Sequence, residues 1–212
     1  MEVIPAINCA TRECAMNRMR EIKELGARWA HVDITDGTFS KTPTWHDAVT
    51  YADAGVSIEV HLMVARPELV VDEWLAAGAR RIIIHIESLR GKDRGVFSSI
   101  VEKCNAHGAT FALSLNPETS VEELMPYIES LAMVHLLAVN PGPSGQQFDE
   151  RIIGKIKTVH AQFPSMAIEI DGGVNPDVLR RAKEAGATHA VAASYIFESA
   201  DMRSAFKALG DA

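Results

Sequence analysis

The segment HVDITDG, residues 31–37, ends an apolar run with a histidine and two carboxylates. His31 and Asp33 are two positions apart, and Asp36 and Gly37 follow at once. Residues i and i+2 of a strand point to the same face, so His31 and Asp33 are expected side by side at the end of a strand. Asp36-Gly37 is typical of the turn that follows. Imidazole and carboxylate groups bind divalent metals, and carboxylates also carry protons. The segment therefore indicates metal or acid–base chemistry.

Two further apolar runs end in the same kinds of side chain. SIEVHLM (57–63) carries Glu59 and His61 on one face, and AIEIDGGVNP (167–176) carries Glu169 and Asp171 before a double glycine. A single strand histidine is usually a satisfied core residue, and the two glutamates are more readily explained as structural carboxylates inside the fold. The combination of two imidazoles and two aspartates at strand ends is harder to explain in this way. These candidate metal ligands are His31, Asp33, His61 and Asp171.

The donor set suits a divalent transition metal such as zinc, iron, manganese or cobalt, and no sequence pattern selects among them. Another run, IIIHIES, places His85 and Glu87 at a strand end, but no role follows from this pair alone.

Glycine-rich segments indicate a second candidate site, for phosphate. Glycines let the backbone approach an anion and turn N–H groups toward it. Each glycine alone is explained by an ordinary turn, whereas together with the metal set they predict phosphate binding. The candidate residues are Gly142, Pro143, Ser144 and Gly145 in VNPGPSGQQF, Gly172 and Gly173 in DGG, and Ala193 and Ser194.

A recurring phrase identifies the elements that position these residues. Leu25-Gly26-Ala27 recurs in related form around Gly55, Gly78, Gly108 and Gly186, each time between a helix-like segment and a β-like run. Such a glycine typically ends a helix in the left-handed conformation. The β-like runs are 2–7, 29–34, 57–61, 81–86, 110–115, 134–139, 167–170 and 189–193.

Eight strands alternating with helices predict an α/β fold with a parallel sheet, and at 212 residues a single (β/α)8 TIM barrel domain over 1–212. An open doubly wound sheet is the alternative, and the lack of G-x-G-x-x-G after the first run disfavours it. The active site of a barrel lies at the C-terminal ends of its strands, where the polar residues above cluster.

Composition narrows the possible partners. A net charge of −7 argues against a nucleic-acid or anionic-membrane surface, but backbone amides can still hold a phosphate. No run approaches membrane-spanning length, and the N-terminus has no secretory h-region. The odd cysteine count, Cys9, Cys14 and Cys104, suggests reduced thiols and a cytoplasmic location. Composition therefore leaves a small phosphorylated substrate as a candidate partner, and further copies of the chain as a possible one.

The chain resembles the ribulose-phosphate 3-epimerase family over nearly its whole length. The matching motifs are HVDITDG (31–37), EVHLMV (59–64), IIIHIE (82–87), LNPET (115–119), VNPGPSGQQF (139–148) and IEIDGGVN (168–175). The resemblance implies that His31, Asp33, His61 and Asp171 bind the metal, that Asp33 and Asp171 are the acid–base pair, and that the glycine segments hold phosphate.

The implied activity is inversion of C3 of a ketose phosphate, with D-ribulose 5-phosphate to D-xylulose 5-phosphate as the expected conversion. Removing the weakly acidic C–H proton is easier when a metal stabilises the enediolate as a Lewis acid. Inversion then requires one carboxylate to remove the proton and another to deliver one to the opposite face.

Several residues depart from the family pattern around the substrate. Ala6 replaces a serine, with Asn8 as a candidate substitute, and Thr35 and Leu137 replace methionines, which leaves Met63. The family's GFGG reads GPSG, its Gly-Ser after the last strand reads Ala193-Ser194, and the loop 38–47 has an unusual sequence. Three alternatives therefore stay open: epimerisation of another ketose phosphate such as a hexulose 6-phosphate, a decarboxylase-type lyase, and a non-catalytic sugar-phosphate-binding barrel. The lyase reading is disfavoured because Asp33-Ile34-Thr35-Asp36 lacks the D-x-K-x-x-D lysine and spacing.

Overall fold

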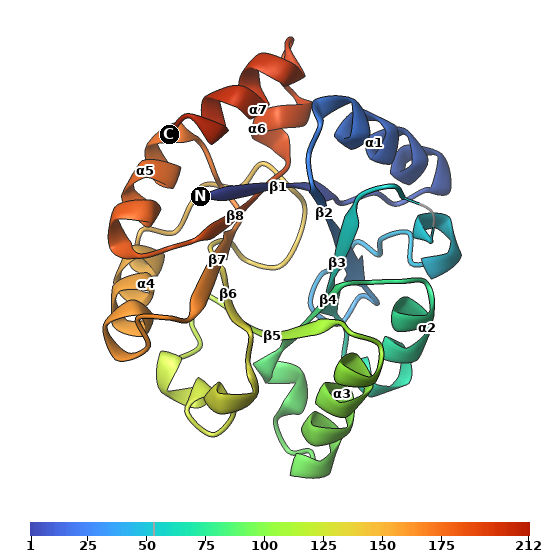
Figure 1. The fold of residues 1–212 in the computed structure, drawn as a ribbon, viewed down its shortest axis with the longest axis vertical. Coiled ribbons are helices and arrows are strands. Elements are labelled where there is room, and N and C mark those ends of the chain that lie inside the picture. The colour runs from blue at the N-terminus through green and yellow to red at the C-terminus, as the bar shows by residue number, and fades with distance from the viewer. Residues whose placement is uncertain (53) are drawn as a thin grey trace.

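Each strand pairs in parallel with its neighbours in sequence, and the last strand pairs with the first, so that the sheet closes into a barrel. The computed structural model describes residues 1–52 and 54–212. Helices lie around the outside of the ring (Figure 1). The strands are β1 (Glu2–Ile7), β2 (Trp29–Thr35), β3 (Ser57–Met63), β4 (Arg81–His85), β5 (Thr110–Leu115), β6 (Met133–Leu137), β7 (Ala167–Asp171) and β8 (His189–Ala192). The predicted TIM barrel is confirmed, and the open sheet is excluded.

The alternation of strands and helices is less regular than predicted. The α-helices are α1 (Arg12–Leu25), α2 (Val71–Ala76), α3 (Arg94–Ala106), α4 (Arg151–Gln162), α5 (Pro176–Ala185), α6 (Ser194–Phe197) and α7 (Met202–Gly210). Within the described residues, the connections after β2 and β5 contain only 3-10 turns, at Ala48–Tyr51 and at Val121–Leu124 and Ile128–Ser130. Pro126 falls in the second connection and cannot continue a helix, because its ring clashes with the preceding turn.

The recurrent glycines end helices or turns as predicted. Gly26, Gly55, Gly78, Gly108 and Gly186 all have positive φ. At Gly26 the backbone N–H bonds to the last turn of α1, and Gly186 does the same for α5. These left-handed residues turn the chain back toward the barrel, where the next strand begins.

The strand register places the polar side chains at one end of the barrel. Asp33 on β2 lies beside His61 on β3, and His31 lies beside Glu59 one layer below. Asp171 ends β7 beside Leu137 of β6. The outward faces of the strands belong to a continuous apolar core, while a small apolar cluster of Ile83, Ala112 and Met133 lies apart from it. The barrel interior is thus shared between apolar packing and a buried polar layer.

The cysteine prediction was wrong for one pair. A disulfide joins Cys9, just after β1, to Cys14 in the first turn of α1, while Cys104 is free and buried. The Thr11 side chain caps α1 by accepting from the Cys14 N–H, which brings the helix start back over the end of β1. Spacing alone does not reveal such a bridge, because it requires the turn between β1 and α1 to bring the two Cα atoms to 5.7 Å. Among the described residues, no helix has the length and apolar character needed to cross a bilayer.

Candidate active site

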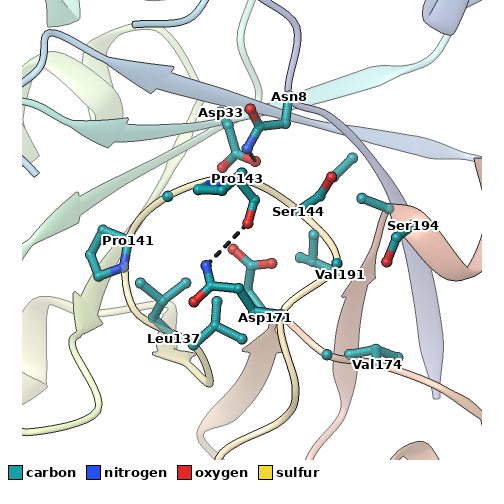
Figure 2. A pocket seen from close by; sticks show the side chains of 18 of the residues that line it. Asn8, Asp33, Leu137, Pro141, Pro143, Ser144, Asp171, Val174, Val191 and Ser194 are labelled. Atoms are coloured by element: carbon teal, nitrogen blue, oxygen red, sulfur yellow. Dashed lines mark hydrogen bonds between the residues drawn. The ribbon is translucent and has the colours of Figure 1, made fainter. Parts of the chain in front are cut away.

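A pocket opens at the C-terminal ends of the strands, as expected for a barrel. Asp33 and Asp171 both line it, and Figure 2 shows Asn8 beside the Asp33 carboxylate. The Asn8 amide donates to Asp33 Oδ2 at 3.3 Å. The other predicted substrate and phosphate residues also line this pocket: Met63, Gly142, Pro143, Ser144, Gly145, Gly172, Gly173, Ala193 and Ser194.

The residues that depart from the family pattern surround the same space. Ala6 and Leu137 line the pocket, whereas Thr35 borders an adjoining hollow under the loop 38–47. The Thr44 hydroxyl accepts from the Thr35 backbone N–H at 3.1 Å, and the Trp45 N–H bonds to the Cys9 carbonyl. These bonds fix the loop 38–47 against the ends of β1 and β2, where Ser40, Thr42, Pro43 and Thr44 line the adjoining hollow.

His31 lies fully buried beneath the pocket, and a carboxylate fixes its orientation. Its Nδ1 is 2.7 Å from Glu59 Oε1, and Glu59 also pairs with Arg81. Burial would raise the pKa of Glu59, but the bond from His31 and the charge of Arg81 lower it, so Glu59 is an anion. An anion only accepts, and His31 Nδ1 is therefore the donor. This leaves Nε2 facing Asp33 Oδ1 at 3.2 Å and Asp171 Oδ2 at 3.8 Å.

A series of hydrogen bonds orients His61 in the same way, running from Thr119 through Glu87 and His85. Burial would raise the pKa of Glu87, but the bonds from His85 and Thr119 lower it to about 2. Burial lowers the pKa of His85 to about 4, so the ring is neutral and donates from Nδ1 to Glu87 Oε2 at 3.1 Å. His85 Nε2 then accepts from His61 Nε2, 2.8 Å away. His61 Nδ1 is left facing Asp33 Oδ1 at 3.3 Å and Asp171 Oδ2 at 3.6 Å.

The electrostatic environment between these two histidines and the two aspartates favours a positive charge. Burial would lower the pKa of His31 and His61, but the carboxylates around them raise both, and that of His31 well above its usual range. Burial would likewise raise the pKa of Asp33 and Asp171, but the facing histidines lower both. Two ring nitrogens and two carboxylate oxygens thus converge where a cation is stabilised.

Two buried residues next to this cluster were not predicted to belong to the site. His135 on β6 places Nε2 3.5 Å from Asp171 Oδ2, and burial together with His61 lowers its pKa to about 3. Both carboxyl oxygens of Glu169 lack a hydrogen-bond partner among the described residues, and burial and Glu59 raise its pKa well above the usual range. The alternation of VHLLAV, in which His135 and Leu137 share a face, was the available signal for His135.

The orienting chain gives a first prediction. Glu87→Gln keeps the size of the side chain but removes the charge that orders His85 and His61, so metal affinity is expected to fall about 10–100-fold. Competition with a chromophoric chelator measures this. The matched control is Glu123→Gln, at a surface ion pair with Arg90, where no change is expected. Equal affinities for the two variants would show that the chain does not orient a ligand.

The phosphate segment depends on glycine at one position above all. Gly173 has φ of 66°, and a Cβ built on it would lie 2.6 Å from the Phe148 Cα, so the 139–148 loop packs directly on the DGG turn. Gln146 holds the same loop by donating to the Asn140 and Pro143 carbonyls at 2.8 and 3.0 Å. No lysine or arginine is found among the described residues that line the pocket.

Gly173→Ala is expected to push the 139–148 loop away from the DGG turn (171–173). The left-handed conformation costs a residue with a Cβ about 1–2 kcal/mol, and overpacking about 1–3 kcal/mol more. We expect the free energy of unfolding to fall by about 2–5 kcal/mol in denaturant titrations. Gly154→Ala is the matched control: it lies in α4 with no atom within 4 Å of its added Cβ, and a helical Ala should be neutral or stabilising. Similar losses in both variants would contradict the packing argument.

Comparisons with known proteins point to one family. The family model described as "Ribulose-phosphate 3 epimerase family" matches residues 2–197. The chain is 34% identical over 205 residues to a ribulose-phosphate 3-epimerase of Chlamydia trachomatis, covering 92% of this chain and 86% of that protein. It is also 34% identical over 191 residues to the "Ribulose-phosphate 3-epimerase, cytoplasmic isoform" of Oryza sativa subsp. japonica, covering 87% and 82%.

Solved structures resemble the chain in fold. A crystal structure of 3-hexulose-6-phosphate synthase superposes with a TM-score of 0.74 over 99% of this chain and 98% of that one, at 16% identity. Identity this low supports the barrel alone, because one fold carries many activities.

Proposed function

Because the chain belongs to the ribulose-phosphate 3-epimerase family and is an isomerase of the epimerase class, we propose that it inverts C3 of a ketose phosphate with the help of a divalent metal ion. The expected conversion is D-ribulose 5-phosphate to D-xylulose 5-phosphate. One observation carries the proposal. Asp33 and Asp171 line a pocket with the glycine segments, and ring nitrogens of two buried histidines lie within 3.8 Å of both carboxylates.

The residues present fit a divalent ion. His61 Nδ1 is buried without a hydrogen-bond partner among the described residues, and it points at two carboxylates. Imidazoles whose other nitrogen is hydrogen-bonded are typical metal ligands. His31, Asp33, His61 and Asp171 would hold zinc, iron, manganese or cobalt. When bound, such an ion supplies Lewis-acid stabilisation of the negative charge that develops beside the reacting carbon.

Asp33 and Asp171 would move the protons. They come from β2 and β7, which β8 and β1 separate in the ring, so the carboxylates reach the pocket from different sides. Each has a lowered pKa, which keeps it ionised at neutral pH and able to accept a proton. In our proposal one removes the C3 proton and the other delivers a proton to the opposite face, and the roles exchange for the reverse reaction. The Asn8 amide, which donates to Asp33 Oδ2, would hold that carboxylate in place.

Phosphate would bind through main-chain N–H groups. The segments 142–145, 172–173 and 193–194 line one side of the pocket, and the positive φ of Gly145, Gly172 and Gly173 suits a backbone that turns its amides to an anion. Met63 would contact the sugar from β3.

A side-by-side assay tests the function. The protein loaded in turn with Zn²⁺, Fe²⁺, Mn²⁺ or Co²⁺ is given D-ribulose 5-phosphate or six-carbon ketose 6-phosphates, and C3 exchange in deuterated water is followed by NMR. Turnover of the pentulose phosphate supports the proposal. Preference for a six-carbon substrate would favour epimerisation of a hexulose 6-phosphate instead. Tight sugar-phosphate binding without turnover for every metal would favour a non-catalytic barrel.

We further propose that residues 1–212 act as one barrel domain in the cytoplasm. The name of the rice relative, a cytoplasmic isoform, supports this location, whereas the Cys9–Cys14 disulfide does not.

A further inference from the structure

We propose that His135 is an additional ligand of the metal, contributing a third imidazole through Nε2. The inference rests on the proposed function and adds a residue to its site. His135 is the central residue of β6 and is fully buried. Its ring centroid lies 4.5 Å from that of His61 and 5.9 Å from that of His31. Three imidazoles from three strands therefore meet under the floor of the pocket.

The position of Nε2 carries the argument. One ligand atom each from His31, His61, His135 and Asp171 can be chosen so that all four lie within 4.8 Å of one another. Two ligand atoms at 2.0–2.1 Å from a common ion are separated by at most about 4.2 Å. Side-chain shifts of a few tenths of an ångström, on the order of ordinary ligand relaxation, would bring the four atoms around one ion.

The hydrogen bonds of His135 point the same way. Its Nδ1 is 2.8 Å from the Ser114 hydroxyl, and Nε2 has no hydrogen-bond partner among the described residues. A ring that donates Nδ1–H to Ser114 presents a lone pair at Nε2. A buried polar atom without a partner is costly, and such atoms in native proteins need an explanation. His61 Nδ1 is without a partner as well, and both nitrogens face Asp171 Oδ2, so one ion would satisfy both.

A third imidazole changes which metal the site prefers. Nitrogen donors suit zinc and cobalt, whereas manganese and magnesium are better matched by oxygen ligands. Sites of nitrogen and oxygen ligands generally bind Co²⁺ more tightly than Mn²⁺, and we expect a third imidazole to widen this preference. In the competing arrangement, Nε2–H donates to Asp171 and merely positions it. In that case His135 would not contact the ion.

Metal titrations distinguish the two arrangements. Co²⁺ is added to the metal-free protein, the visible ligand-field spectrum is recorded, and the affinities for Co²⁺ and Mn²⁺ are measured by chelator competition. His135→Leu is expected to change the Co²⁺ spectrum and to narrow the preference over Mn²⁺. The Co²⁺ affinity should fall by about 100-fold or more, because losing a ligand should cost at least as much as losing a residue that only orients one. Ser114→Ala keeps the imidazole and removes only its hydrogen-bond partner, so the Co²⁺ affinity should fall by about 10-fold. This variant keeps the test decisive if His135→Leu does not fold.

His107→Gln is the control. This exposed histidine follows α3 on the surface, and its Nδ1 bonds to the Lys103 carbonyl, so spectrum and affinities should not change. If the Co²⁺ spectrum of His135→Leu is unchanged and the parent protein is active, His135 is not a ligand, and the proposed function is unaffected. Failure of the parent protein to bind any metal would overturn both. Altered spectra in His135→Leu alone, or in His135→Leu and Ser114→Ala, support the inference.

Discussion

Asp171→Asn is expected to lower the rate of epimerisation by about 10²-fold or more, the scale of general acid–base catalysis. The variant keeps the size of the side chain but loses a carboxylate that can accept and return a proton. The same loss is expected for Asp33→Asn, because inversion needs a proton carrier on each face. Coupled enzyme assays measure the turnover, and metal analysis of each variant separates lost chemistry from lost metal.

The exchange of the C3 proton gives a sharper reading of the two variants. A protein with one working carboxylate can still remove the proton from one epimer and return deuterium to the same face. Exchange in deuterated water without formation of the other epimer is therefore expected in at least one variant. Near-normal turnover with metal bound would refute the two-aspartate mechanism, and Glu59 and Glu169 would be the next candidates.

Removal of the metal by a chelator is expected to lower turnover by about 10³-fold or more, since Lewis-acid stabilisation contributes several kcal/mol and each 1.4 kcal/mol is tenfold. Activity should return when Zn²⁺ or Co²⁺ is added back. Full activity of a protein shown by elemental analysis to be free of metal would refute metal dependence.

Metal affinity should also depend on pH. The pKa values of His31 and His61 are raised in the metal-free protein, and that of His31 well above its usual range, so a bound proton competes with the metal. Affinity is therefore expected to increase as pH rises through neutrality toward these values and to fall on acidification. Chelator competition on both sides of neutrality measures it. The opposite slope would mean that the histidines are not the groups displaced.

The convergence of the site was predictable because strand ends of a barrel meet at one rim. The positive-φ glycines mark where strands begin, and alternation then assigns His31, Asp33, His61 and Asp171 to inward faces. This reasoning uses only periodicity and topology, which local sequence encodes.

The rest of the site depends on packing that periodicity does not contain. His135 follows the same alternation, but its Nε2 reaches the site only because β6 lies beside β7 and Ser114 holds the ring. The bridge between Cys9 and Cys14 depends on how the chain turns from β1 into α1. The missing helix after β5 reflects Pro126 interrupting an otherwise helical composition.

The closure of β8 onto β1 has a consequence for folding. β2 and β3 bring His31, Asp33 and His61 together through neighbouring strand pairs, whereas Asp171 arrives from β7, late in the chain. A chain with an open ring therefore holds an incomplete cation site, and bringing its distant segments together costs loop-closure entropy. An ion that binds only the closed ring stabilises it by mass action. Only chains whose barrel has closed would then bind the metal tightly. The free energy of pairing between β1 and β8 would increase with the concentration of free metal ion.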